Sequence, residues 1–177
     1  LVLLLALAAT SRTPRLLECT PVSVLSSVMQ AATLGLEPST GLGHCYLVPF
    51  YNKNVRGYEC TLIVGYRGLI DLARRSGEIS FIEARCVYMN DKFDLTYGLG
   101  TKLEHRPTIK GEPGELLGVY AIARLRGADE PLVEFMTRAQ VDTLRERSGK
   151  GDDTGPWKTD YDEMARKTVL RRIFKYC

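Results

Sequence analysis

Cations recur at helical spacing near the end of the chain, in a segment predicted to be helical from Asp160 to Tyr176. At about 100° per residue, one side of this helix is apolar and contains Ala165, Val169, Leu170, Ile173 and Phe174. The opposite side carries Lys167, Arg171 and Lys175, and Arg172 flanks it. Cations spaced along one surface can neutralise successive phosphates of a nucleic acid, although a run of charges is more often an ordinary solvated surface.

Arg166 departs from this division because it falls on the apolar side, one turn after Asp162. Two readings are open. Arg166 forms a partly buried ion pair with Asp162, or it contacts a phosphate in a groove, since a guanidinium suits carboxylate and phosphate alike.

The other candidate cations are spread over three further places in the chain. They are Lys53, Arg56, Arg67, Arg74, Arg75 and Lys158. Lys53 and Arg56 lie in a polar stretch suited to an exposed hairpin tip, and the next three lie in a helix that opens at Tyr66. Together with the last helix, they supply enough positive charge to follow a phosphate backbone.

Aromatic rings provide a second means of holding single strands, because bases stack on them. The candidates are Tyr51, Tyr58, Tyr66, Phe81, Tyr88, Tyr97, Trp157 and Tyr161. Most of these rings are expected in the core. Tyr66 and Trp157 are retained as candidates because each precedes a cation at the junction of a loop and a helix.

Catalytic and metal sites have weaker support. The run Gly65–Gly68 lacks the spacing of a phosphate-binding loop. His44 and Cys45 are adjacent on a predicted strand, so their side chains diverge, which argues against a nucleophile–base pair and against a zinc site with Cys60, Cys86 or His105. Asp152 and Asp153 are acidic enough for Mg²⁺ but are typical of a solvated loop. We predict no catalytic residue, metal or cofactor.

Length and composition favour one folded unit. The chain has 177 residues with 45% hydrophobic content, so we expect a single domain over residues 1–177. The net charge is only +3, so binding to an anion depends on local clustering. Residues 156–177 contain six basic and three acidic residues, a net +3 by themselves.

The cysteines and the first residues bear on the cellular context. Five cysteines, an odd number without a CxxC pair, indicate reduced thiols in a cytosolic protein. Leu1–Ala9 is too short to span a bilayer and no basic residue precedes it, which favours a core helix over a signal peptide. The missing initial Met, and an end within an amphipathic pattern, are typical of a truncated chain.

Turn and periodicity signals predict the order of the elements. A helix starts at Thr20-Pro21, with an apolar stripe of Val24, Leu25, Val28, Met29 and Ala32, and stops at Gly35. Strands over Tyr46–Phe50 and Glu59–Gly65 form a hairpin, and the next helix stops at Gly77. Five more strands are predicted over Ile79–Met89, Phe93–Tyr97, Lys102–His105, Glu115–Leu125 and Leu132–Met136.

Thr137 then caps a helix to Arg147, a glycine-rich loop covers Ser148–Gly155, and Asp160 caps the last helix. Grouped strands followed by helices predict an α+β fold: a mostly antiparallel sheet with a β-hairpin and packed helices.

Several long segments occur in the order found in one known family. They are GLEPSTGLGHCYLVPF, GYRGLIDLARRSG, GPW and DEMARKTVLRRIFKY, and the likeness runs from about Leu25 to Tyr176. On these segments the chain resembles the RecT family of phage single-strand DNA annealing proteins. The resemblance implies an annealing core of the kind found in Redβ and the Rad-type annealers.

The resemblance also implies a function. RecT-like proteins bind single-stranded DNA and anneal complementary strands without ATP, in phage homologous recombination, in the cytoplasm of the bacterial host. It implies homo-oligomers, as rings or helical filaments, with a phage exonuclease and the host single-strand binding protein as partners. Annealing leaves bases free to pair, so we expect cations to matter more than aromatic rings.

Two other functions remain as alternatives. A metal-dependent nuclease would act through the acidic loop and would shorten labelled DNA in Mg²⁺ or Mn²⁺. A structural oligomerisation protein would use the basic helix to bind acidic protein surfaces.

Overall fold

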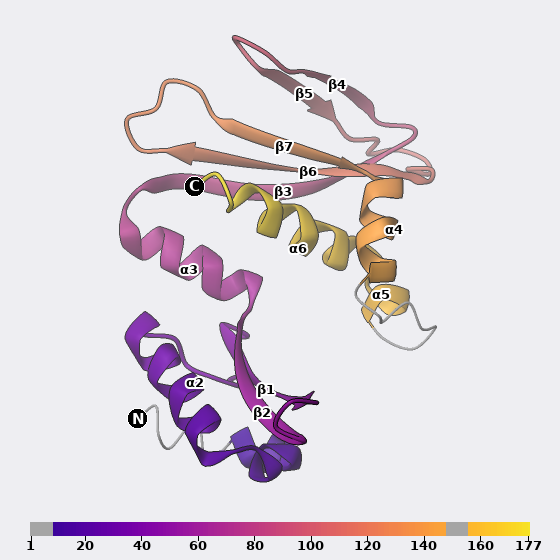
Figure 1. The fold of residues 1–177 in the computed structure, drawn as a ribbon. Coiled ribbons are helices and arrows are strands. Elements are labelled where there is room, and N and C mark those ends of the chain that lie inside the picture. Colours follow the sequence, from indigo (N-terminus) through magenta and orange to yellow (C-terminus); the bar gives the residue numbers. More distant parts are fainter. Residues whose placement is uncertain (1–8, 148–155) are drawn as a thin grey trace. The chain divides into compact units, whose positions relative to one another are not determined.

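The computed structural model describes residues 9–147 and 156–177 and contains two compact units, Leu1–Arg75 and Ser76–Cys177 (Figure 1). The predicted glycine-rich loop over 148–155 lies outside the described residues, as does nearly all of the predicted first helix. Within the described ranges, no helix has the length and apolar character needed to cross a membrane. That the two units act as one domain stays a prediction.

The first unit is a helix packed on a hairpin. It contains the 3₁₀ helix η1 (Pro14–Glu18), helix α2 (Pro21–Leu34), strands β1 (Cys45–Asn52) and β2 (Gly57–Val64), and helix α3 (Tyr66–Ser76). β1 and β2 pair antiparallel from Cys45↔Val64 to Asn52↔Gly57. Buried side chains of η1, α2 and the hairpin form the core between them: Leu16, Cys19, Val28, Leu47 and Cys60.

The predicted bounds of α2 are confirmed, but its predicted apolar stripe is only partly buried: Val28 is buried and Val24 packs against the same core. Gly35 is left-handed, with φ of 62°, and ends the helix as expected. Leu25 and Met29 are exposed, whereas Ser27 and Ala31 are buried. These two residues are small, and the Ser27 hydroxyl donates to the Cys60 carbonyl at 2.9 Å, so α2 lies close against β2 on this side.

The second unit is built on a three-stranded antiparallel sheet in the order β3–β6–β7. These strands are β3 (Ile79–Tyr88), β6 (Leu116–Leu125) and β7 (Leu132–Thr137). Helix α6 (Tyr161–Ile173) packs on one face, and a hairpin of β4 (Lys92–Thr96) and β5 (Lys102–Arg106) lies over the other (Figure 1). The described elements thus confirm an α+β fold with antiparallel sheets.

Successive side chains of β6 point to opposite faces of this sheet and are used on both. Val119, Ala121 and Ala123 are fully buried on the α6 side. Tyr120 points the other way, where its ring stacks on Phe93 of β4 with centroids 5.9 Å apart. The sheet therefore holds α6 and the β4–β5 hairpin in place at once.

The predicted caps have different outcomes. Helix α4 (Arg138–Arg147) begins with a reciprocal cap, in which the Gln140 N–H donates to the Thr137 hydroxyl and the Thr137 N–H donates to the Gln140 side chain. The prediction for Thr137 is confirmed. Asp160 occupies the N-cap position of α6, but its carboxylate accepts the Thr159 hydroxyl at 2.5 Å and caps no backbone N–H, so that prediction is wrong.

Candidate nucleic-acid interface

The tip of the β1–β2 hairpin presents two candidate cations. Lys53 and Arg56 are exposed between the last paired residues, Asn52 and Gly57. The Asn52 side chain accepts the Asn54 N–H at 2.9 Å, and Arg56 has a left-handed φ of 51°. The turn geometry therefore fixes the backbone while both cationic side chains remain in solvent.

The start of α3 is shaped by a close approach of backbones. A Cβ on Gly65 or Gly68 would collide with the carbonyl oxygens of Gly43 and His44 respectively, so both positions require glycine. The Gly65 N–H donates to the His44 carbonyl at 2.8 Å. The two glycines of the GYRG segment thus have a packing role.

Tyr66 and Arg67 follow this contact. The Arg67 guanidinium lies over the Tyr66 ring, 5.9 Å from its centroid, and Arg67 Nε donates to the Tyr66 hydroxyl at 3.4 Å. Arg67 is exposed and Tyr66 is half-buried. The pair places a cation and an aromatic ring side by side on one surface.

The two arginines at the end of α3 differ. Arg75 pairs with Asp71 at 3.0 Å and donates to the Leu34 carbonyl at 2.9 Å, so it ties α3 to the end of α2. Arg74 is exposed and has no ion pair among the described residues. Arg74 is therefore the better placed of the two for an external anion.

Helix α6 confirms the predicted division into two sides. Ala165, Val169, Leu170 and Ile173 are buried, and Phe174 just beyond the helix is half-buried. Arg171 is exposed and Lys167 is half-buried. The helix ends at Ile173 and not at Tyr176 as predicted, so Lys175, which is exposed, lies in the turn that follows it. Because the apolar side is fixed on the sheet, the cationic side has a defined direction.

Arg172 is not part of the free cationic side. Its Nε donates to the Glu134 carboxylate of β7 at 2.5 Å. This ion pair holds α6 against the sheet. Because Glu134 already balances its charge, Arg172 is less suited to bind a phosphate.

Arg166 pairs with Glu163, not with Asp162, so the predicted partner is wrong. Asp162 instead accepts the hydroxyl of Tyr88 on β3. Arg166 Nε is buried and has no hydrogen-bond partner among the described residues.

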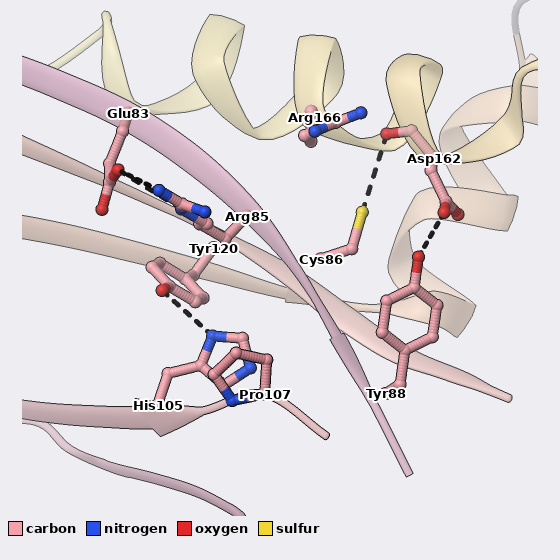
Figure 2. Close-up of a pocket in the computed structure, with 9 residues that line it drawn as sticks. All are labelled: Glu83, Arg85, Cys86, Tyr88, His105, Pro107, Tyr120, Asp162 and Arg166. Atoms are coloured by element: carbon pink, nitrogen blue, oxygen red, sulfur yellow. Dashed lines mark hydrogen bonds and ion pairs between the residues drawn. The ribbon is translucent and has the colours of Figure 1, made fainter. Parts of the chain in front are cut away.

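Arg166 lies in a groove of about 420 Å³ beside β3, one of the two edge strands of the sheet (Figure 2). Cys86 and Tyr88 line its α6 side. Glu83 and Arg85 lie on the other side of the strand and hydrogen-bond to each other. The groove is thus lined by two acidic side chains, Glu83 and Asp162, and two basic ones, Arg85 and Arg166.

Burial weakens the acidity of two groups in this groove, the Cys86 thiol and the Tyr88 hydroxyl. It raises the pKa of the Cys86 thiol to about 12, with the Asp162 charge adding to the effect. Burial and the bond to Asp162 also raise the pKa of Tyr88. Neither group ionises near neutral pH, so neither is suited to act as a nucleophile.

Trp157 is only 8% exposed and packs edge-on against Tyr161, with centroids 5.7 Å apart. Its ring has little surface to offer a base. Lys158, the next residue in the short helix α5 (Pro156–Thr159), is exposed.

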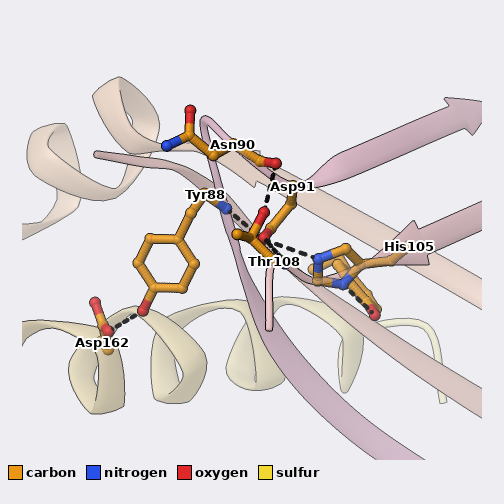
Figure 3. A network of polar contacts seen from close by, with 7 residues as sticks. Tyr88, Asn90, Asp91, His105, Thr108 and Asp162 are labelled. Carbon is orange, nitrogen blue, oxygen red and sulfur yellow. Dashed lines mark hydrogen bonds and ion pairs between the residues drawn. The ribbon is translucent and has the colours of Figure 1, made fainter. Parts of the chain in front are cut away.

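A polar network on the opposite face of the sheet was not anticipated (Figure 3). Asp91 accepts the backbone N–H groups of Tyr88 at 2.9 Å and Thr108 at 2.7 Å, and its carboxylate lies 3.1 Å from His105 Nε2. His105 Nδ1 lies 3.2 Å from the Tyr120 hydroxyl. His105 therefore fixes the β4–β5 hairpin to β6, a structural role that the turn residues Asn90-Asp91 could have suggested.

The other sites weighed above, a nucleophile beside His44 and a metal site, are not formed by the described residues. Cys45 is buried, which raises the pKa of its thiol to about 11, so it is not a nucleophile beside His44. No three His, Cys, Asp or Glu side chains gather as metal ligands within 9–147 and 156–177. Asp152 and Asp153, named for Mg²⁺, lie outside these ranges.

Comparison with known proteins gives a consistent picture. The RecT family model matches residues 2–177. The chain is 46% identical over 167 residues to Protein RecT of Escherichia coli (strain K12), covering 93% of this chain and 61% of that protein. It is 33% identical over 156 residues to the uncharacterized protein YqaK of Bacillus subtilis (strain 168), covering 86% of this chain and 50% of YqaK. The chain thus spans between half and about three fifths of these relatives.

Proposed function

The chain belongs to the RecT family, and from this membership we propose that it binds single-stranded DNA and anneals complementary strands without ATP. The process is phage homologous recombination in the cytoplasm of a bacterial host. The protein acts as a homo-oligomer, without catalytic residues or a cofactor. A phage exonuclease and the host single-strand binding protein are its proposed partners.

The observation that carries the proposal is the exposed cationic side of α6, whose other side is buried on the sheet. Arg171 lies in the last turn of α6 and Lys175 lies in the turn that follows it, at a spacing suited to neighbouring phosphates. Such contacts hold the phosphate backbone of the DNA and leave its bases uncovered by the protein and free to pair.

The first unit offers a second group of cations for the same task. Lys53, Arg56, Arg67 and Arg74 are exposed. Arg75, Arg166 and Arg172 form ion pairs, so we assign them mainly to holding the fold. Tyr66 is retained as a ring beside Arg67, and Trp157 is left out because it is buried.

The test is fluorescence-quench annealing of two complementary oligonucleotides, with the second strand added to protein already bound to the first and with no nucleotide triphosphate. We expect pairing faster than the spontaneous rate, with the acceleration lost at high salt because counterion release drives the binding. Tight binding without acceleration would leave a single-strand binder. Shortening of the labelled strands in Mg²⁺ would favour a nuclease instead.

A further inference from the structure

The ring of Tyr46 lies against backbone that carries no side chains. Tyr46 is on β1 and is 44% exposed. A Cβ on Gly43 would lie 2.9 Å from the Tyr46 hydroxyl oxygen, and a Cβ on Gly65 would lie 3.3 Å from Cε2 of the same ring. Because both positions are glycine, the ring can rest close to the backbone while nearly half of the residue stays in contact with solvent. The ring is therefore both supported and accessible.

A cation borders this ring. Cδ of Arg67 would lie 3.9 Å from the same Cβ on Gly43, so the side chains of Arg67 and Tyr46 both border the space above this glycine. The Arg67 guanidinium also lies 5.9 Å from the centroid of the Tyr66 ring, and Arg67 Nε donates to the Tyr66 hydroxyl. Arg67 is thus positioned beside two aromatic rings, and we call Tyr46, Tyr66 and Arg67 together the Tyr46 site.

The charges around the site favour a polyanion. Residues 1–75 contain seven basic and four acidic residues, a net +3. Alternation along β1 places Phe50, which is 50% exposed, on the same face as Tyr46. The exposed cations Lys53 and Arg56 follow at the hairpin tip. Exposed rings on this face therefore have cations at both ends, with Arg67 at one end and the tip at the other.

We propose that a base of the bound single strand stacks on Tyr46 while Arg67 binds the phosphate beside it. The site rests on the single-strand binding of the proposed function and adds to it a contact with the bases. An exposed tyrosine ring accepts the flat face of any base, so this contact needs no particular sequence. The bordering cations supply the charge that a phosphate backbone requires.

Stacking on Tyr46 is compatible with annealing. It uses the flat face of a base, whereas pairing uses the Watson–Crick edge. A base held on the ring therefore keeps its edge open to the complementary strand. The exposed cations of α6 act on phosphates alone, so the Tyr46 site and α6 should respond differently when the bases are removed and the phosphates are kept.

The experiment compares two oligonucleotides that carry the same number of phosphates. One is oligo-dT, and the other has the same length with a stable abasic residue at every position. Fluorescence anisotropy at one fixed salt concentration gives the affinity of the full chain for each. The variants are Tyr46→Leu, Tyr46→Phe and Arg67→Ala. Phe81→Leu is the control, since Phe81 of β3 is 47% exposed and lies in the second unit.

We expect the wild type to bind oligo-dT more tightly than the abasic strand. Tyr46→Leu should lower the affinity for oligo-dT by about 5- to 150-fold, the range for loss of one stacked base, and leave the affinity for the abasic strand unchanged. Tyr46→Phe keeps the ring and should keep the preference. Arg67→Ala should weaken both complexes equally, because a phosphate contact does not depend on the base. Phe81→Leu should match the wild type.

Equal affinity of the wild type for the two oligonucleotides would overturn the proposal, and so would an unchanged preference in Tyr46→Leu. Circular dichroism shows whether each variant is folded. A second measurement needs no variant: oligo-dT with one iododeoxyuridine is irradiated in the complex, and mass spectrometry locates the cross-linked residue. A cross-link to Tyr46 would support stacking, and cross-links only to other residues would contradict it.

The same measurements separate this proposal from the proposed function. A wild type that binds neither oligonucleotide would contradict single-strand binding itself. A wild type that binds both equally and still anneals complementary strands would contradict only the Tyr46 site.

Discussion

Neighbouring cations on α6 have different surroundings, and this difference predicts different effects of substitution. Arg171 and Lys175 are exposed, and neither has an ion pair among the described residues, whereas Arg172 is tied to Glu134. The first two should act mainly on DNA and the third mainly on the stability of the fold. Spacing alone could not separate them, because all three fall within the predicted last helix.

Arg171→Ala with Lys175→Ala should weaken single-strand binding and lower the slope of log affinity against log salt by about 1 to 2, because each lost phosphate contact removes about 0.7 to 0.9 from it. Fluorescence anisotropy at several salt concentrations measures the slope. Lys102→Ala with Lys110→Ala removes the same charge from other exposed positions and should leave the slope unchanged. An unaltered slope in the first variant would remove α6 from the interface.

Tyr88→Phe should lower the free energy of unfolding by about 1 to 3 kcal/mol, because it leaves the Asp162 carboxylate without the hydroxyl that it accepts. Urea unfolding measures this loss. Asp162→Asn, alone and combined with Tyr88→Phe, completes a double-mutant cycle. Strict additivity of the two changes would show that the bond contributes nothing.

At the scale of elements, the glycines before and within α3 have a role that their spacing did not reveal. The segment Gly65–Gly68 lacks the spacing of a phosphate-binding loop, and its glycines instead admit the carbonyls of Gly43 and His44. Only the close approach of two distant segments shows this, and no local pattern encodes it.

Gly68→Ala should destabilise the protein by several kcal/mol, although alanine favours a helix by about 1 kcal/mol over glycine. The added Cβ would meet the His44 backbone, which is not free to move. Gly41→Ala is the control, since nothing lies within 4 Å of a Cβ there. Similar melting temperatures for the two variants would mean that the chain relaxes at this contact.

Because of the Asp91 network, the stability of the β4–β5 hairpin depends on pH. Burial alone would raise the pKa of Asp91, but the N–H groups of Thr108 and Tyr88 and the His105 ring outweigh it and lower that pKa. A carboxyl group with a lowered pKa in the folded state contributes stability above its ordinary value of about 4. That contribution is lost as the pH falls through the lowered value.

In Asp91→Asn, the free energy of unfolding should therefore fall less than in the wild type between about pH 5 and pH 2. Urea titrations at several pH values measure the curve. Asp94→Asn, at an exposed position on β4, should keep the wild-type curve. Equal steepness in both variants would contradict the assigned role of Asp91.

The elements themselves were largely predictable. Alternation and turn residues located every strand to within one or two residues, and Gly35 and Gly77 ended their helices. Which side of α2 is buried was not predictable from hydrophobicity, because Ser27 and Ala31 are buried for their small size while Leu25 and Met29 stay exposed. Glu163, the partner of Arg166, lies three residues before it on the same helix, so helical spacing allowed Asp162 and Glu163 alike. That Asp162 binds Tyr88 of β3, and that Arg172 pairs with Glu134 of β7, depends on tertiary packing.

At the scale of the whole molecule, the two compact units differ in how completely they are covered. The second unit buries its sheet under α6 on one face and the β4–β5 hairpin on the other. The first unit leaves large apolar side chains exposed on α2 and on β1, among them Leu25, Met29, Tyr46 and Phe50. A unit with one thin core layer and large exposed apolar area has little stability of its own.

The fragment Ser76–Cys177 should fold alone and unfold cooperatively in urea, whereas Leu1–Arg75 alone should lack a cooperative transition. Circular dichroism at 222 nm and intrinsic fluorescence from Trp157, the single tryptophan, follow the larger fragment. A featureless urea titration of Ser76–Cys177 would show that its fold requires the first unit.

The five thiols differ in exposure, so the unmodified chain can be labelled selectively at one cysteine. Cys19, Cys45 and Cys60 are buried and Cys86 is half-buried, while Cys177 is exposed. A maleimide dye should therefore attach to Cys177 in the unmodified sequence. The dye would sit just beyond Arg171 and Lys175, where its emission can report the arrival of a first strand and then of its complement.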